Sequence, residues 1–263
     1  MAQALHDFHS DDLVTFDVGR GLIEAAQTIG LNRLSPLQVQ AVLAGVFTPQ
    51  MVEPGRRIPS RLVLAGPAGC GKKTLAELAA AHRAHMGCRV LVVVSDDTAA
   101  TRCARRLAVY GAAGLRSGPC QTALDLDRLD LGVMSVDRAI ELLVGEAAAK
   151  HRVGLVLVED MHDQYELLAV WPRLLAHCQV QTENVQRFVF LCDDVAWGQK
   201  LAQVLRAHLV CEQSLGGAPS HSPSPGLSSL LVPSFFDKLR VGVRLVEEKT
   251  NTAIHLRPPQ LKR

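Results

Sequence analysis

The segment that most constrains the fold is glycine-rich and runs Gly66-Pro67-Ala68-Gly69-Cys70-Gly71-Lys72. An apolar run, residues 61–65, comes directly before it, and an Ala-, Leu- and Glu-rich stretch, residues 73–86, follows. The spacing is G-x-x-x-x-G-K, in which glycines let backbone N–H groups turn toward phosphate oxygens and the lysine neutralises them. The positive end of a following helix adds to this attraction. We therefore expect a buried strand, a phosphate-binding loop and a helix, in that order.

Further apolar runs follow along the chain, at residues 89–94, 131–134, 154–158 and 187–191. They are nearly continuous in apolar character rather than alternating, which is typical of parallel strands covered on both faces. Helical patterns come after them, at residues 98–110, 137–150, 165–178 and 197–208. Strands and helices that alternate at this spacing predict an α/β fold with a doubly wound, mostly parallel sheet.

Composition limits the class of protein. The 263 residues are 48% hydrophobic and 21% charged with a net charge of +2, so the chain can bury a substantial core and is not disordered. The near-neutral balance leaves nucleic-acid binding open. Seven cysteines without a C-x-x-C pair indicate reduced thiols. With no secretory signal and no apolar run of membrane-spanning length, we expect a cytoplasmic or nuclear protein.

The phosphate loop departs from its usual pattern at one position. The residue after the loop lysine normally offers a Ser or Thr hydroxyl to Mg²⁺, but here it is Lys73, and Thr74 comes one residue late. A lysine offers no oxygen ligand. We expect phosphate binding at this loop, and the sequence leaves Mg²⁺-dependent hydrolysis open.

A pair of acids, Glu159-Asp160, follows the apolar run at residues 154–158. A phosphate-loop enzyme needs a carboxylate at such a strand end for Mg²⁺ and usually a second group to position water. Glu159 and Asp160 are therefore the candidate catalytic residues, with Glu159 as the candidate Mg²⁺ ligand. The alternative is a polar strand end without catalysis, and the sequence does not decide between the two.

The order of the motifs resembles that of the first RecA-like domain of superfamily 1 helicases, in the branch of the nonsense-mediated-decay and Armitage-type helicases. Residues 34–42, LSPLQVQAV, are similar to the family's L-N-x-x-Q-x-x-A-V. Residues 94–100, VSDDTAA, resemble A-P-S-N-x-A-A, and Glu159-Asp160 stands where the family has Asp-Glu. Residues 192–196 resemble G-D-x-x-Q, but the glutamine has become Ala196, and Thr250 stands where the family has an arginine that reaches the γ-phosphate.

The resemblance implies ATP as cofactor, with Mg²⁺ in doubt, and a nucleic-acid partner, RNA being favoured over DNA. Gln38 would recognise adenine, and the phosphates would be bound by a contiguous set: Gly66, Pro67, Ala68, Gly69, Cys70, Gly71, Lys72, Lys73 and Thr74. Nucleic acid would be contacted by Ser95, Thr98, Arg102 and Ser135. Arg105, Arg106 and Arg116 add to a basic region beside these residues.

The resemblance also suggests how the chain is divided. We expect an N-terminal extension over residues 1–33 and a RecA-like domain over 34–212. A Ser-, Pro- and Gly-rich linker or loop would follow over 213–229, and then the end of this domain, with the possible start of a truncated second one, over 230–263. Two hypotheses stay open. One is a nucleic-acid-dependent ATPase of the helicase class that is not competent alone. The other is a catalytically inactive pseudo-helicase that docks RNA or protein partners, which could supply or replace a second RecA domain.

The helix expected after the phosphate loop carries a possible set of metal ligands. His82, His85 and Cys88 are spaced three apart on an expected helix, which could place them on one face for a zinc ion. With no fourth ligand in view, the pattern favours a polar helix surface.

Overall fold

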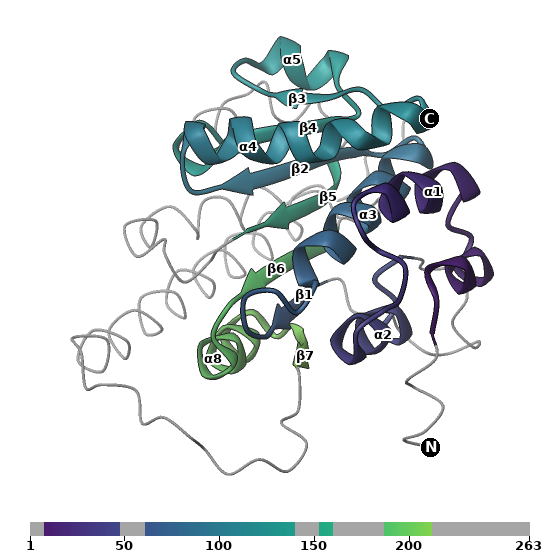
Figure 1. The fold of residues 1–263 in the computed structure, drawn as a ribbon. Helices are drawn as coiled ribbons and strands as arrows, with labels where there is room; N and C mark the ends of the chain where they lie inside the picture. The colour runs from purple at the N-terminus through teal and green to yellow at the C-terminus, as the bar shows by residue number, and fades with distance from the viewer. Residues whose placement is uncertain (1–7, 48–60, 140–152, 160–186, 212–263) are drawn as a thin grey trace, which may run out of the picture.

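A computed structural model describes residues 8–47, 61–139, 153–159 and 187–211 (Figure 1). Its centre is a parallel sheet. The described strands are β1 (Arg61–Ala65), β2 (Arg89–Val94), β3 (Ser117–Pro119), β4 (Leu131–Ser135), β5 (Val153–Val158), β6 (Arg187–Cys192) and β7 (His208–Cys211). They pair in the order β3-β4-β2-β5-β6-β1-β7, and every pairing is parallel. The predicted α/β fold with a mostly parallel sheet is confirmed.

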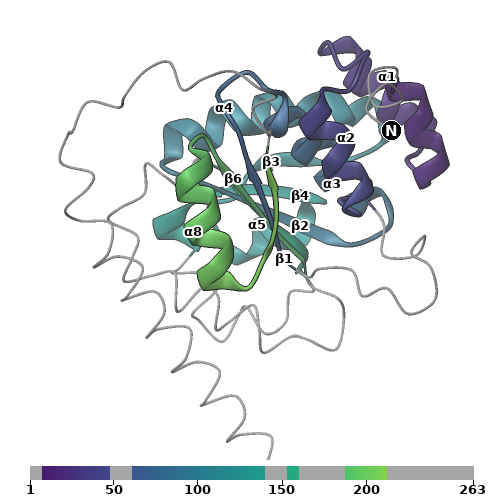
Figure 2. The same cartoon turned by 90° about the horizontal axis from the view of Figure 1, so that it is seen from below.

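Helices cover both faces of this sheet. The described ones are η2 (Ser10–Phe16), α1 (Arg20–Thr28), α2 (Pro36–Leu43), α3 (Lys72–His85), α4 (Asp97–Leu107), η3 (Ala108–Ala113), α5 (Ala123–Arg128) and α8 (Val195–Leu205). Figure 2 shows α3 and α8 on opposite sides of the strands. Along β1, Leu62 and Leu64 join the core under α1 to α4, whereas Val63 and Ala65 join the core under α8. This alternation follows from the two-residue period of a strand and explains why the run is apolar throughout.

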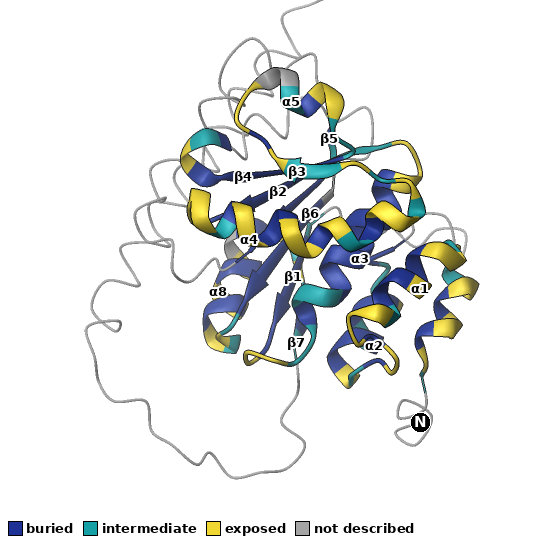
Figure 3. Cartoon of the chain, turned by 45° about the horizontal axis from the view of Figure 1, so that its top comes forward, coloured by how far each residue is buried: buried dark blue, intermediate teal, exposed yellow. Residues whose placement is uncertain are grey.

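The inner strands are buried, the edge strands β3 and β7 are partly exposed, and the outer sides of the helices are exposed (Figure 3). Residues 8–33, expected as an extension, pack against the same core as the sheet. Leu13, Val18, Leu22 and Ile23 are each at most 1% exposed there. None of the described helices is long and apolar enough to cross a membrane.

Element boundaries agree well where apolar runs are long and less well elsewhere. The strands expected at 61–65 and 89–94 have those bounds in the structure. The helix expected over 197–208 differs at both ends, because α8 runs from Val195 to Leu205 and β7 begins at His208. Arg206 lies between them with φ 50°, the left-handed conformation that commonly ends a helix. The expected helix at 165–178, nearly all of that at 137–150, and the expected linker and terminal segment over 213–263 lie outside the described residues.

Candidate functional site

The candidate site residues that end or directly follow described strands lie at one edge of the sheet, because parallel strands place their carboxyl ends together. The loop of residues 66–71 follows β1, Ser95 follows β2, Ser135 ends β4, Glu159 follows β5 and Asp193 follows β6. The pairing of β1 with β6 and of β2 with both β4 and β5 makes these positions neighbours. Asp160, the second candidate catalytic residue, lies outside the described residues.

The loop after β1 has a backbone that only glycine tolerates well. Gly69 and Gly71 both have φ +84°, in the left-handed region where a Cβ is disfavoured. A Cβ on Gly71 would also lie 2.5 Å from the side-chain nitrogen of Gln38. The backbone N–H of Gly66 donates to the carbonyl of Cys192, which ties the loop to the end of β6. Gly71 is the N-cap of α3, so the loop leads directly into the positive end of a helix.

Lys72 folds back over this loop. Its ammonium donates to the carbonyl oxygens of Gly66 at 2.9 Å and Pro67 at 3.1 Å, and it forms an ion pair with Asp193. The residue is only 4% exposed. A phosphate that entered the loop would take the place of these carbonyl and carboxylate partners, since an ammonium has three donors and no acceptor.

A cavity of about 360 Å³ opens beside the loop. Its lining includes Leu31, Leu34, Cys70 and Thr74 together with Gln38. Its volume lies within the range of small-molecule sites, about 300 to 1,000 Å³. The walls combine aliphatic side chains and glycine backbone with polar groups, among them Arg33, Ser35 and the Gln38 amide.

Gln38 is held in place by a capping box at the start of α2. Its side-chain nitrogen donates to the Gly71 carbonyl at 2.9 Å, and its side-chain oxygen accepts from the Ser35 N–H at 2.7 Å. An amide has two hydrogens and two acceptor lone pairs, so one of each stays available. A glutamine amide recognises adenine through one donor and one acceptor. Gln38 is 4% exposed, and the adenine-recognising role that the resemblance implies for it stays a prediction.

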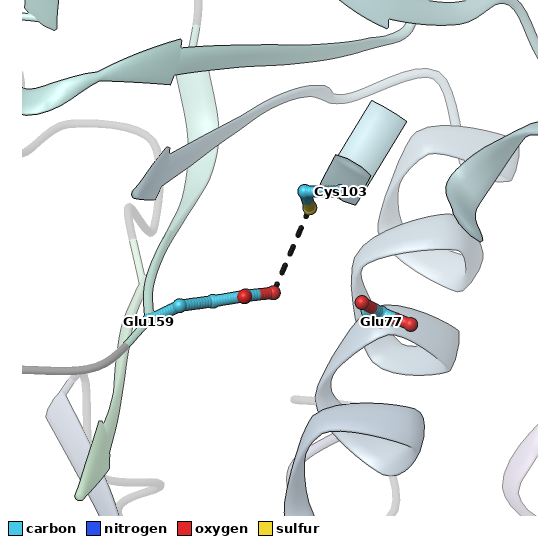
Figure 4. A group of neighbouring side chains, drawn as sticks. All are labelled: Glu77, Cys103 and Glu159. Atoms are coloured by element: carbon cyan, nitrogen blue, oxygen red, sulfur yellow. Dashed lines mark hydrogen bonds between the residues drawn. The ribbon is translucent and has the colours of Figure 1, made fainter. Parts of the chain in front are cut away.

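Glu159 points toward Cys103 on α4 and Glu77 on α3 (Figure 4). Glu159 is 2% exposed. Arg106 on α4 donates from one nitrogen to both carboxylate oxygens at 3.1 Å, and the Lys73 ammonium lies 3.6 Å from one of them. The Cys103 thiol donates to the same carboxylate at 3.6 Å. Two cations thus already face the candidate metal ligand.

Glu77, on α3 one turn after Lys73, completes a buried cluster with Glu159, Cys103 and Arg106. Arg106 donates to its carboxylate at 2.7 Å, and burial nevertheless raises the pKa of Glu77 to about 7. Ligand atoms of Glu77, Cys103 and Glu159 lie within 4.8 Å of one another, the spacing of a metal site. Burial raises the pKa of the Cys103 thiol far above its usual range, so it carries no charge for a metal. Arg106 already supplies the cation between the carboxylates, and the cluster is best described as a buried ion-pair network.

The residues around Glu159 do not fit Mg²⁺. This ion prefers oxygen ligands, and the position that usually supplies a hydroxyl holds the Lys73 ammonium instead. Thr74, the other hydroxyl, lines the cavity beside Gln38, whereas it is Lys73 that reaches Glu159. Consecutive residues on a helix are rotated by about 100° around its axis, so Lys73 and Thr74 point in different directions.

The four candidate nucleic-acid residues divide into two groups. Ser95, Thr98 and Arg102 are exposed at the end of β2 and along α4. Ser135 is 5% exposed, and its hydroxyl donates to the Asp97 carboxylate at 2.8 Å. Arg138, which the sequence analysis did not single out, pairs with the same carboxylate at 3.0 Å and neutralises it.

Two interpretations of charged residues need correction. Of the expected basic region, Arg106 turns inward to Glu77 and Glu159, whereas Arg102, Arg105 and Arg116 are exposed, and Arg116 pairs with Asp130. The helix carrying His82 is not a polar surface at that position. His82 is 1% exposed and packs edge-on against Phe47 at 5.9 Å between ring centroids. Within the described residues its two ring nitrogens have no hydrogen-bond partner.

Comparison with known proteins identifies the fold. No known protein family matches the sequence, and no curated protein does. Among solved structures, the chain is similar to a hypothetical ATP-dependent RNA helicase from Sulfolobus tokodaii, with a TM-score of 0.54 and 11% sequence identity. The match covers 74% of this chain and 57% of that one, so this chain spans little more than half of the matched protein. The architecture is that of a RecA-like α/β domain, and at this identity the similarity establishes the fold alone.

Proposed function

We propose that the chain is a helicase-type phosphate-loop domain that binds ATP. This proposal rests on two adjoining features. A glycine loop ending in Lys72 leads into the N-terminus of α3, and a cavity of about 360 Å³, lined in part by Gln38, lies directly beside this loop. Phosphates at a helix N-terminus and a purine beside a glutamine amide are each favoured on physical grounds. The descent from superfamily 1 helicases of the nonsense-mediated-decay and Armitage-type branch rests on the sequence motifs.

RNA is the proposed macromolecular partner. The exposed residues Ser95, Thr98 and Arg102 lie at the sheet edge that also carries the phosphate loop, and the family binds nucleic acid on this side. Arg102 would contribute a phosphate contact. Its replacement by alanine is then expected to weaken RNA binding about equally for all sequences and to reduce the salt dependence. An unchanged salt slope would argue that RNA, if bound, lies elsewhere.

A second candidate function is favoured by the Lys73–Glu159 contact. A domain that binds nucleotide without turnover, a pseudo-helicase scaffold, needs no metal at the end of β5. There Glu159 already faces Lys73 and Arg106. The discriminating assay is RNA-stimulated ATPase activity with a second RecA domain supplied. Robust turnover would reject the scaffold, and a Lys73→Thr variant that gained turnover over wild type would support it.

Nucleotide binding itself is tested with a fluorescent ATP analogue and the Lys72→Ala variant. Removing the ammonium should weaken binding at least tenfold, because it deletes the charge that faces the phosphates. Lys200→Ala is the matched control, since it removes an exposed lysine on α8. Circular dichroism of both variants checks that they fold. Equal and undetectable binding in wild type and Lys72→Ala would reject the ATP-binding proposal.

A further inference from the structure

We infer that this site takes nucleotide in its metal-free form, with the Lys73 ammonium supplying the positive charge that a divalent cation would otherwise bring. The inference rests on the proposed ATP binding and specifies which species of ATP is bound. It starts from two adjacent lysines at the start of α3. Lys72 lies inside the loop and Lys73 at the end of β5.

The first step concerns position. Lys73 follows the loop lysine directly, at the place where a hydroxyl would hold the metal. Its Nζ lies 3.6 Å from Glu159 Oε2. The side chain is 38% exposed, so its end is accessible from solvent and can turn toward an incoming phosphate. The ammonium thus lies beside the strand-end carboxylate.

The second step concerns charge. Glu77 and Glu159 are buried beside Lys73 and Arg106, so two acidic groups already face two cations. A divalent ion placed at Glu159 would be repelled by both cations at short range, in a region where water screens poorly. The Glu159 carboxylate, the expected oxygen ligand of that ion, would also have to give up the two hydrogen bonds that it accepts from Arg106. Binding a metal here is therefore opposed by charge as well as by the missing hydroxyl.

The third step concerns the ligand. A triphosphate without metal carries more negative charge than its Mg²⁺ complex, and this loop has one more lysine than the usual pattern, in which a Ser or Thr follows the loop lysine. Lys72, Lys73 and the N-terminus of α3 all lie at residues 71–73. Two ammonium groups and a helix end are complementary to the free polyphosphate. Excess Mg²⁺ should then compete for the nucleotide rather than assist its binding.

The test is a titration of the full 263-residue chain with a fluorescent ATP analogue, once in EDTA and once in excess Mg²⁺. We expect affinity in EDTA to equal or exceed that in Mg²⁺. A loss of tenfold or more in EDTA would overturn the inference while leaving nucleotide binding in place. Absence of binding in both conditions would instead reject the proposed function, and the inference with it.

Lys73→Thr provides the matched variant, because it removes the ammonium and restores the missing hydroxyl. It should lose about tenfold in affinity in EDTA, the cost of about one charge-assisted contact, and recover in Mg²⁺. Lys200→Thr makes the same substitution on α8 and should behave as wild type in both buffers. An Lys73→Thr protein with wild-type affinity in EDTA would contradict the role of Lys73.

Discussion

Replacing Arg106 with methionine should destabilise the domain by about 3 kcal/mol near pH 8. Arg106 donates to two carboxylates, Glu77 and Glu159, whose side chains are each 3% exposed. Removing one partner of a buried ion pair costs about 3–5 kcal/mol, because a charge stays buried without compensation. The Arg106 side chain is itself 41% exposed, so water can enter and the lower value applies. Methionine keeps the apolar stem, so the loss reports the charge.

The cost should depend on pH in a defined direction. Burial raises the pKa of Glu77 to about 7 from an ordinary value of 4.5, and removing Arg106 should raise it further. Below about pH 7 the folded forms of both proteins hold this proton, so the variant loses stability relative to wild type as pH rises above about 7, where Glu77 ionises in wild type but not in the variant. Near pH 5.5, where Glu77 is mostly protonated, the destabilisation should fall to roughly half of its value near pH 8.

Urea unfolding of both proteins at the two pH values measures the difference. Arg105→Met is the matched control, because Arg105 is an exposed neighbour on α4, and it should change stability by less than about 0.5 kcal/mol. Combining Glu77→Gln with Arg106→Met should recover part of the loss, since one buried charge is then gone. A loss below about 0.5 kcal/mol, or a loss independent of pH, would refute the description of this cluster as a buried ion-pair network.

Three further predictions concern other parts of the fold. Gly198→Ala should destabilise by about 1–3 kcal/mol in a thermal melt despite better helix propensity, because its Cβ would lie 2.5 Å from that of Ala65; a stabilised variant would contradict the packing of α8 on β1. Burial lowers the pKa of His82 to about 4, so wild type should lose stability as pH falls from about 6.5 to 4, and His82→Leu should lack this component in urea unfolding. Asp193→Asn should tighten binding of the ATP analogue severalfold by releasing Lys72, and weaker binding would argue against that competition.

The phosphate loop could be predicted because its signal is contiguous. Residues 61–86 contain the strand, the glycines and the lysine in one stretch, and the structure gives β1 the expected bounds and α3 nearly so. The loop's link to Gln38 also has a local signal, since Ser35 and Gln38 have the spacing of a capping box. Interactions between residues that are close in the sequence determine these features, so they can be predicted from the sequence.

The environment of Glu159 could not be predicted, because its partners are distant along the chain. Arg106 is 53 residues away, and no periodic pattern links the two. The sequence therefore presented Arg106 as one basic surface residue among several. Lys73 is noticeable in the sequence, since a lysine at that position is unusual. Its contact with Glu159 could be predicted only with the order of the strands in the sheet known. β3 and β7 were missed for another reason: Ser117–Pro119 has little strand propensity, and β7 follows α8 after only two residues.

A crystal structure of the chain with a non-hydrolysable ATP analogue, grown in EDTA, tests the central claim most directly. The account predicts the base beside Gln38 and the phosphates within residues 66–72, with the Lys72 ammonium moved from the Gly66 and Pro67 carbonyls onto a phosphate oxygen. Lys73 should lie between the phosphates and Glu159. A loop that stays closed, with Lys72 still bound to Gly66 and Asp193 and the nucleotide elsewhere or absent, would contradict it.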